Sequence, residues 1–144
     1  MAETNNKATL QNMQSKLQAM GGVKAVSIGE PPSVQSGHVS IIMNGGEVDE
    51  TTLGQPREIH RVTLRRWEQW QERPVEQIDF DLDEWRTEIM KDFFGDFDLG
   101  GTIAYALPTE FSWAYGYQTI GQTVHRLLDL EIAYRVDNRA SFVA

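Results

Sequence analysis

Two runs of alternating acidic residues are the first candidates for chemistry, because regularly spaced carboxylates can bind calcium. Residues 79–83 read Asp-Phe-Asp-Leu-Asp, and residues 96–98 read Asp-Phe-Asp. A calcium-binding loop needs glycine at its sixth position and a bidentate glutamate at its twelfth. The first run has Glu84 and Met90 at these positions, and the second has Leu107 at its twelfth. The sequence therefore predicts no metal site, and a solvated helix start and a polar turn account for the two runs.

The other residue types that usually carry catalysis are scattered. His38, His60 and His125 lie on three separate predicted strands without the spacing of metal-binding pairs, although the fold could still bring them together. The chain has no cysteine and so no thiol nucleophile. No serine has the surroundings of a nucleophile elbow, and no glycine pair precedes the lysine of a phosphate-binding loop. We therefore expect no catalytic, cofactor-binding or metal-binding residues, and no enzymatic activity.

The only basic concentration in the chain is a group of arginines near its middle: Arg57, Arg61, Arg65, Arg66 and Arg73. One interpretation is a solvated strand face. The other is an ion-pairing edge that meets the acids of another subunit. Three acids are candidates for that contact: Glu47, Asp49 and Glu50. Separation of unlike charges within one chain suits head-to-tail assembly, in which different patches meet around a closed ring.

Aromatic residues alternate along the predicted strand 110–120. Trp113, Tyr115 and Tyr117 fall on one face of it, because side chains alternate between the faces of a strand. Such a row is either part of the core or an anchor at an interface, where tryptophan and tyrosine are enriched. The sequence alone leaves both interpretations open.

Length and composition indicate one globular domain. The chain has 144 residues, of which 40% are hydrophobic and 24% charged, and its formal net charge is -8. This acidic balance argues against a general nucleic-acid binder, yet suits a surface that DNA passes without adhering. No apolar run is long enough to cross a membrane, and residues 1–7 lack the apolar segment of a signal peptide. We expect a protein that stays in the cytoplasm where it is made, with no membrane partner.

Residues 124–136 predict the element around which the fold is organised. Every second residue is apolar except Arg126, and the intervening residues are mostly charged or small. This pattern predicts a long strand with one buried face. Two amphipathic helices are predicted from apolar stripes, the first over residues 7–20, ended by Gly21-Gly22, and the second over residues 75–94. An alternative makes residues 77–82 a strand, with Asp83 capping a shorter helix.

The remaining segments complete an α+β domain. Strands are predicted over residues 23–28, 38–43, 58–71, 102–107 and 110–120, and a thirteen-residue loop over residues 44–56. The order is α-β-β-β-α-β-β-β, a mainly antiparallel sheet packed with two helices. We expect a single domain over residues 1–144, with a mobile polar leader (1–6) and a mobile tail (138–144).

This layout, together with a few short motifs, resembles a known family. The first helix ends in Gly-Gly-Val-Lys-Ala-Val at residues 21–26, and the second leads to Asp-Leu-Gly-Gly-Thr-Ile at residues 98–103. The last strand ends in Ile-Ala-Tyr-Arg-Val at residues 132–136. Across residues 7–137 the chain resembles the tail terminator, or tail completion, proteins of long-tailed bacteriophages and gene transfer agents, the family of the phage lambda tail terminator.

The resemblance implies a structural protein of the virion, located at the neck end of the tail. Such proteins form a hexameric ring on the last ring of the major tail-tube protein. They stop tube polymerisation and present the docking surface for the head-tail connector or stopper protein, while DNA passes only as cargo. The family brings no catalytic residues. Alternatives are a head-tail joining (neck) protein, a tail-tube-like subunit of the same virion, or an unrelated small α+β enzyme or binding protein.

Overall fold

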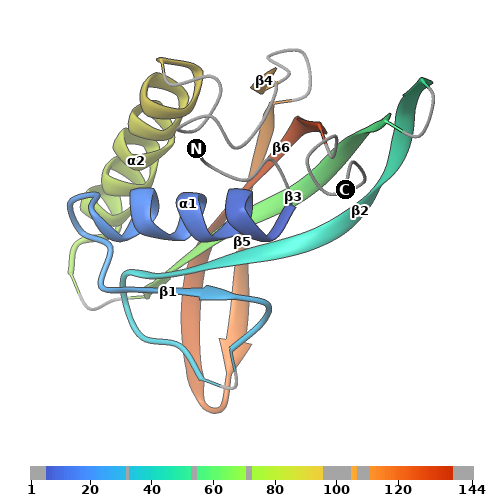
Figure 1. Cartoon of the computed structure of the whole chain (residues 1–144). Helices are drawn as coiled ribbons and strands as arrows, with labels where there is room; N and C mark the ends of the chain where they lie inside the picture. The colour runs from blue at the N-terminus through green and yellow to red at the C-terminus, as the bar shows by residue number, and fades with distance from the viewer. Residues whose placement is uncertain are drawn as a thin grey trace.

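The computed structural model describes residues 6–31, 33–52, 55–70, 73–95, 105–106 and 111–137. The elements are α1 (Asn6–Gln18), β1 (Ala25–Ile28), β2 (His38–Thr52), β3 (Gln55–Gln69), α2 (Val75–Gly95), β4 (Tyr105–Ala106), β5 (Ser112–Ile120) and β6 (Thr123–Asp137). This order confirms the predicted α+β class (Figure 1). The expected mobile segments, apart from Asn6, and most of the predicted strand 102–107 lie outside the described residues.

All six strands belong to one sheet, in the order β1-β2-β3-β6, with β4 and β5 both paired to the far side of β6. The pairing of β1 with β2 is parallel, and the other pairings are antiparallel. The ladder between β3 and β6 is continuous from Arg57 opposite Asp137 to Gln69 opposite His125. The predicted long last strand is thus confirmed, and it forms the middle of the sheet.

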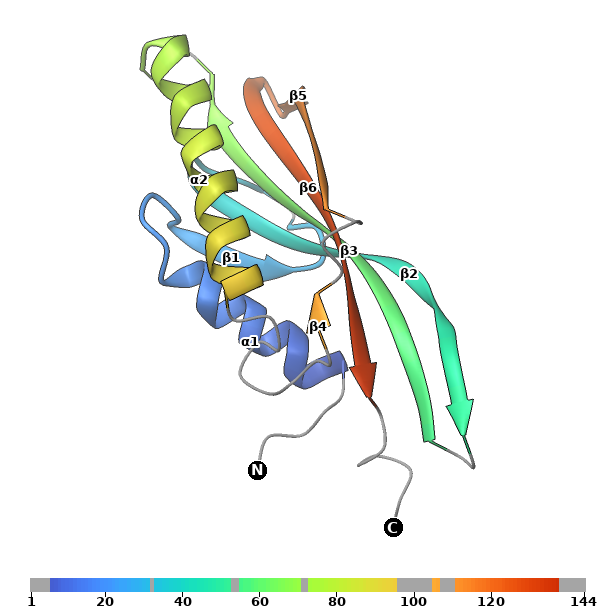
Figure 2. The ribbon, with the colours of Figure 1, turned by 90° about the horizontal axis from the view of Figure 1, so that it is seen from above.

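Both helices lie on the same side of the sheet (Figure 2). The apolar set of β6 faces them, and Leu128, Leu130 and Tyr134 are each no more than 1% exposed. The predicted stripe of α2 fills the other half of the core, with Ile78 and Leu82 fully buried. Burying side chains of this size contributes about 1.5–3 kcal/mol each, before the entropy cost of ordering them. The alternative with a strand at residues 77–82 is wrong, because a continuous helix places both residues on the core side.

The prediction of a loop over residues 44–56 is wrong for residues 44–52 and 55–56, which lie in strands. Residues 44–52 continue β2 and residues 55–58 begin β3, so that Glu47 pairs with Ile59 and Thr52 with Gln55. The pairing shifts register between Met43 and Gly45 and again between Val48 and Glu50. We call residues 44–52 and 55–58 the arm, and it projects beyond the two helices (Figure 2). Its many polar and glycine residues are not typical of strands, and backbone hydrogen bonds hold the two strands of the arm together.

An ion pair is buried between the sheet and α2. Arg66 Nη2 lies 2.6 Å from Glu68 Oε1, and the two side chains are 4% and 3% exposed. The guanidinium of Arg66 also lies 5.5 Å from the ring centroid of Trp85. Arg73 approaches the second oxygen of Glu68 at 3.7 Å. The pair is therefore almost fully buried, so each charge depends on the other.

Replacing Glu68 with glutamine should destabilise the protein by about 3–5 kcal/mol, since Arg66 would stay buried without its counter-charge. The double variant Arg66→Met with Glu68→Leu should lose much less, because no uncompensated charge is left. Urea denaturation of the three proteins measures the difference. A single variant as stable as the double variant would contradict this account of the pair.

Candidate functional site

The three histidines do not form a site. His38, His60 and His125 lie on β2, β3 and β6, respectively. His60 Nε2 is 2.9 Å from Glu58 Oε1, and its ring stacks on Tyr134 at 5.6 Å between centroids. Among the residues that the structure describes, no three histidine, aspartate or glutamate side chains are grouped so as to hold a metal ion.

The run of alternating acids at the start of α2 binds arginines. Asp79 accepts from Arg126 of β6 at 2.9 Å. Asp81 pairs with Arg73 at 2.7 Å, and Asp83 with Arg86 one turn along α2 at 3.0 Å. Asp79 and Asp83, four residues apart, share the helix face that meets Arg126 and Tyr115, and Asp81 pairs elsewhere with Arg73. The interpretation as a solvated helix start was incomplete, because ion pairs tie the acids to other parts of the fold.

The closest approach to a nucleophile and base is at the junction of β1 and β2. Ser27 Oγ lies 3.0 Å from His38 Nε2 and 2.8 Å from Ser40 Oγ. However, the Ser27 hydroxyl also donates to the Gly29 carbonyl at 3.2 Å, so its proton is directed away from the imidazole. Burial lowers the pKa of His38 below its usual value. The group joins two parallel strands through neutral hydrogen bonds and does not resemble an activated serine.

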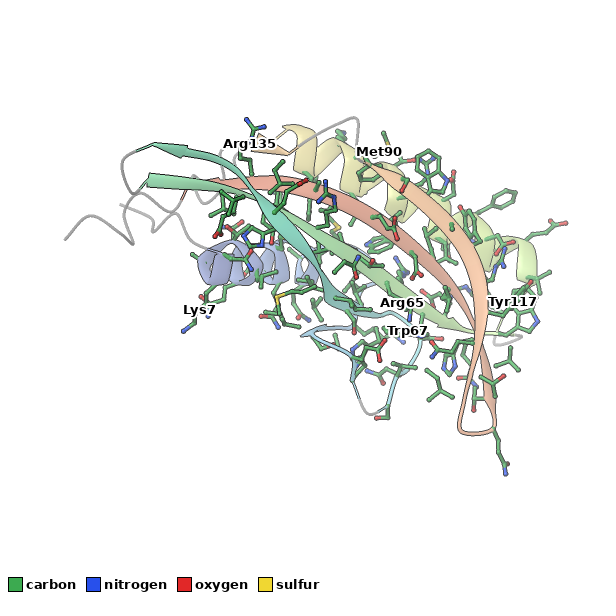
Figure 3. The ribbon with its side chains drawn as sticks, turned by 90° about the vertical axis from the view of Figure 1, so that its right-hand side faces the viewer. Lys7, Arg65, Trp67, Met90, Tyr117 and Arg135 are labelled. Carbon is green, nitrogen blue, oxygen red and sulfur yellow. The ribbon has the colours of Figure 1, made fainter. Side chains whose placement is uncertain are left out.

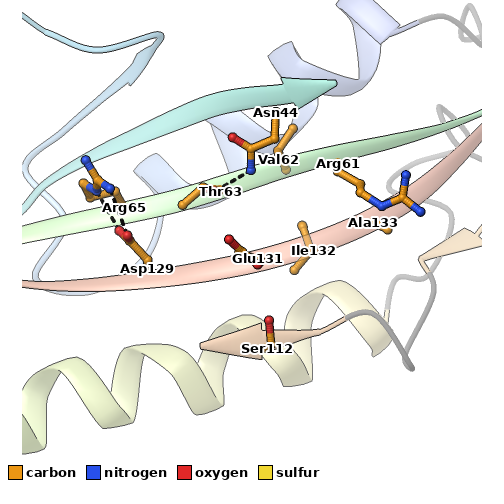
Figure 4. Close-up of a pocket in the computed structure, with 10 residues that line it drawn as sticks. All are labelled: Asn44, Arg61, Val62, Thr63, Arg65, Ser112, Asp129, Glu131, Ile132 and Ala133. Atoms are coloured by element: carbon orange, nitrogen blue, oxygen red, sulfur yellow. Dashed lines mark hydrogen bonds and ion pairs between the residues drawn. The ribbon is translucent and has the colours of Figure 1, made fainter. Parts of the chain in front are cut away.

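The face of the sheet opposite the helices is a polar trough. A hollow of about 600 Å³ lies on it (Figure 4), lined by Asn44, Arg61, Val62, Thr63, Arg65, Ser112, Asp129, Glu131, Ile132 and Ala133. Arg65 crosses it with a bidentate bond, its Nε and Nη2 lying 2.7 and 2.9 Å from the two oxygens of Asp129. This bond raises the pKa of Arg65. Arg65 and Asp129 thus neutralise each other, which favours a structural surface over a small-molecule site.

The predicted arginine edge is only partly assembled. Arg61 meets Glu47 across the arm at 3.0 Å, within one chain. Arg65 is held by Asp129, and Arg66 lies in the core, so the expected edge position is wrong for Arg66. The backbones of Asp49, Glu50 and Arg57 lie on the arm, but their side chains lie outside the described part of the structure. A contact of these residues with another subunit stays a prediction.

The aromatic row, which we define as Trp113, Tyr115 and Tyr117, lies on the helix side of the sheet at its outer edge. Its members are 45%, 38% and 57% exposed, so they are not core residues. Figure 3 shows Tyr117 on β5. Trp113 and Tyr115 lie opposite Leu130 and Leu128 of β6, which places the row beside α2.

Two arginines that sequence reasoning did not single out support this row. The guanidinium carbon of Arg86 lies 4.2 Å from the ring centroid of Trp113. That of Arg126 lies 5.1 Å from the centroid of Tyr115 and 4.5 Å from that of Tyr117. The signal for Arg126 was visible, because it is the one charged residue in the apolar set of the last strand. The row is therefore a partly exposed surface of stacked rings and cations, a composition typical of interface anchors.

The close packing of the arm gives a test of its role. A Cβ atom at Gly46 would collide with the carbonyl oxygen of Ile59 on the facing strand. We expect Gly46→Val to distort the arm while the core stays folded, whereas Gly21→Val has open space around it and serves as the control. Hydrogen exchange of β2 amides should rise in Gly46→Val alone, with the amides of α2 protected in both variants. Uniform loss of protection would contradict the view that the arm opens independently of the core.

The partly buried imidazole of His38 gives a second test. Because burial lowers the pKa of His38 in the folded state, the protein should lose stability as the pH falls below the unfolded value of about 6.5. Replacing His38 with glutamine removes this contribution. Melting temperatures measured at pH about 7.5 and about 5 should fall further in the wild type than in the variant. Equal changes in the two proteins would show that His38 makes no such contribution.

The part of the chain that the structure describes contains no helix long and apolar enough to cross a membrane. No protein-family model matches the sequence, and no curated protein matches it.

Proposed function

We propose that this chain is a virion structural protein, a tail terminator that forms a hexameric ring on the tail tube of a long-tailed bacteriophage. In this role it stops polymerisation of the major tail-tube protein and provides the docking surface for the head-tail connector or stopper protein. It acts at the neck end of the tail and has no catalytic role. DNA passes its channel only as cargo, for which a net charge of -8 is suited because it repels phosphate.

The observation that most supports this proposal is that the sheet offers two unlike surfaces at opposite ends. The arm extends beyond the helices at one end, and β5 carries the aromatic row at the other (Figure 2). A ring needs unlike surfaces of this kind, because each subunit must present one patch to the neighbour before it and another to the neighbour after it. The same observation favours one alternative, a tube-like subunit, because unlike surfaces also build open helical polymers.

The described hollows do not favour an enzyme. In the trough, the bidentate Arg65–Asp129 pair joins β3 to β6, and Asn44 donates to Thr63. At the junction of β1 and β2, Ser27 is bonded to His38, and its hydroxyl donates to the backbone carbonyl of Gly29. Active sites usually keep groups available for substrate and hold them at perturbed pKa values. These polar groups instead join strands to one another.

Purified protein should form a closed hexameric ring that does not grow with concentration, because subunit contacts are satisfied once the ring closes. Native mass spectrometry and negative-stain microscopy measure this directly. A phage lacking the gene should assemble tails of irregular length that do not join heads. Long tubes formed by the protein alone would favour the tube-like alternative, and a monomer at high concentration would contradict the proposal.

A further inference from the structure

The outer edge of β5 has none of the features that keep sheet edges from pairing. Its nine residues, Ser112–Ile120, include no charged residue and no proline. The register with β6 runs without irregularity from Ser112 opposite Glu131 to Ile120 opposite Thr123. Within the described residues, no strand pairs with its other side. Natural edge strands are normally protected by charges, prolines or bulges, so a bare edge of this length indicates a partner strand.

The backbone groups that such a partner would meet can be identified. A two-residue turn joins β5 to β6, so Ile120 and Thr123 form the closing hydrogen-bonded pair, and the pairs alternate from there. The N–H groups of Trp113, Tyr115, Tyr117 and Thr119 therefore point away from β6. Consistent with this pattern, the carbonyl of Val124, which lies opposite Thr119, accepts from the amide of Trp70 at 2.9 Å on the β3 side.

On the other side of the sheet the short strand β1 is the terminal strand, and beyond its end the edge belongs to β2. Pairing with β1 ends at Ile41, and from Ile42 to Thr52 no other strand of the described chain lies on that side. This edge is protected against indiscriminate pairing, because it has two register shifts and carries Glu47, Asp49 and Glu50. β5 carries no charged residue, so it has no charge that would repel Glu47 of an arm.

The side chains of the two edges are also compatible. Met43 and Val48 are 59% and 60% exposed. They lie opposite Val62 and Glu58 of β3, positions on the helix side of the sheet. The aromatic row is on the same side, so continuing the sheet from β5 into the arm of another copy would place exposed apolar side chains beside exposed rings.

We propose that β5 of one subunit pairs with the β2 edge of the arm of the next, so that the sheets form one continuous band around the ring. Following the antiparallel pairings across the sheet, β2 runs opposite to β5, so subunits related by a modest rotation would form an antiparallel junction. The two edges lie at opposite ends of β6. Closure therefore requires strands tilted to the ring axis, as in β-barrels, where the tilt is about 35–45°. This inference rests on the proposed ring.

The first test places a charge on the bare edge. Ala114→Lys adds a lysine at an exposed position in the middle of β5, and Gln122→Lys adds the same charge at an exposed position in the turn, outside the ladder. We expect native mass spectrometry to show loss of the ring in Ala114→Lys and an intact ring in Gln122→Lys. Both variants should melt within a few degrees of the wild type, because neither side chain is buried.

The second test identifies the occupant. The chain has no cysteine, so single cysteines can be introduced without side reactions. Val48→Cys, at a position 60% exposed, marks the arm, and Thr119→Cys marks the helix side of β5. A short bis-maleimide should join the two variants when they are mixed and reassembled, and should join neither variant to itself. A double variant should give a covalent ladder that ends at the ring size.

The outcomes separate this inference from the proposed function. A ring that persists in Ala114→Lys overturns the pairing and leaves the terminator proposal standing. If Ala114→Lys loses the ring but the mixed cysteine variants do not cross-link, the β5 edge has a partner other than the arm. Cross-linked rings from a protein that is absent from purified virions would support the pairing and contradict the terminator role. A monomeric wild type would contradict both.

Discussion

The antiparallel ladder between β3 and β6 is the constraint on which the other elements depend. It pairs residues 57–69 with residues 125–137 without a break, and every other strand except β1 is attached to one of these two. The alternation of side chains divides the ladder into a mostly apolar face, which is turned toward the helices, and an opposite face, which carries the trough. A shift of one residue would exchange the two faces, so burial of the apolar set fixes the register.

Most of the fold follows from periodicities that are visible in the sequence. The stripe from Leu10 to Leu17 predicts α1, and the stripe from Ile78 to Phe93 predicts α2, because an apolar helical face has to be buried. The alternation in β6 predicts its strand. Sequence reasoning failed at the arm because residues 44–56 combine glycine, threonine and acids with few apolar anchors. The strand pairing there rests on backbone hydrogen bonds and on the partner strand β3, which local composition does not reveal.

The surfaces were less predictable than the core. The clustering of arginines in the sequence suggested one edge, but the strand sends Arg65 and Arg66 to opposite faces, one to Asp129 and the other to Glu68. The alternation along β5 predicts the aromatic row. Whether the row is exposed depends on how much of the sheet α2 covers. The partners and exposure of surface side chains depend on distances between elements that are remote in the chain. A local sequence pattern indicates only how residues close in the chain are arranged.

The ion pairs of Asp79, Asp81 and Asp83 have a consequence for the rigidity of the free subunit. A helix held only by an apolar stripe can roll about its own axis with little loss of contact. Here α2 is fastened to β6 through Arg126 and to the segment before it through Arg73, while Tyr115 reaches Asp83 at 3.4 Å. The roll angle of α2 is thereby set, and with it the shape of the surface beside β5. A partner would meet a template that is already formed, and little ordering entropy would be lost on contact.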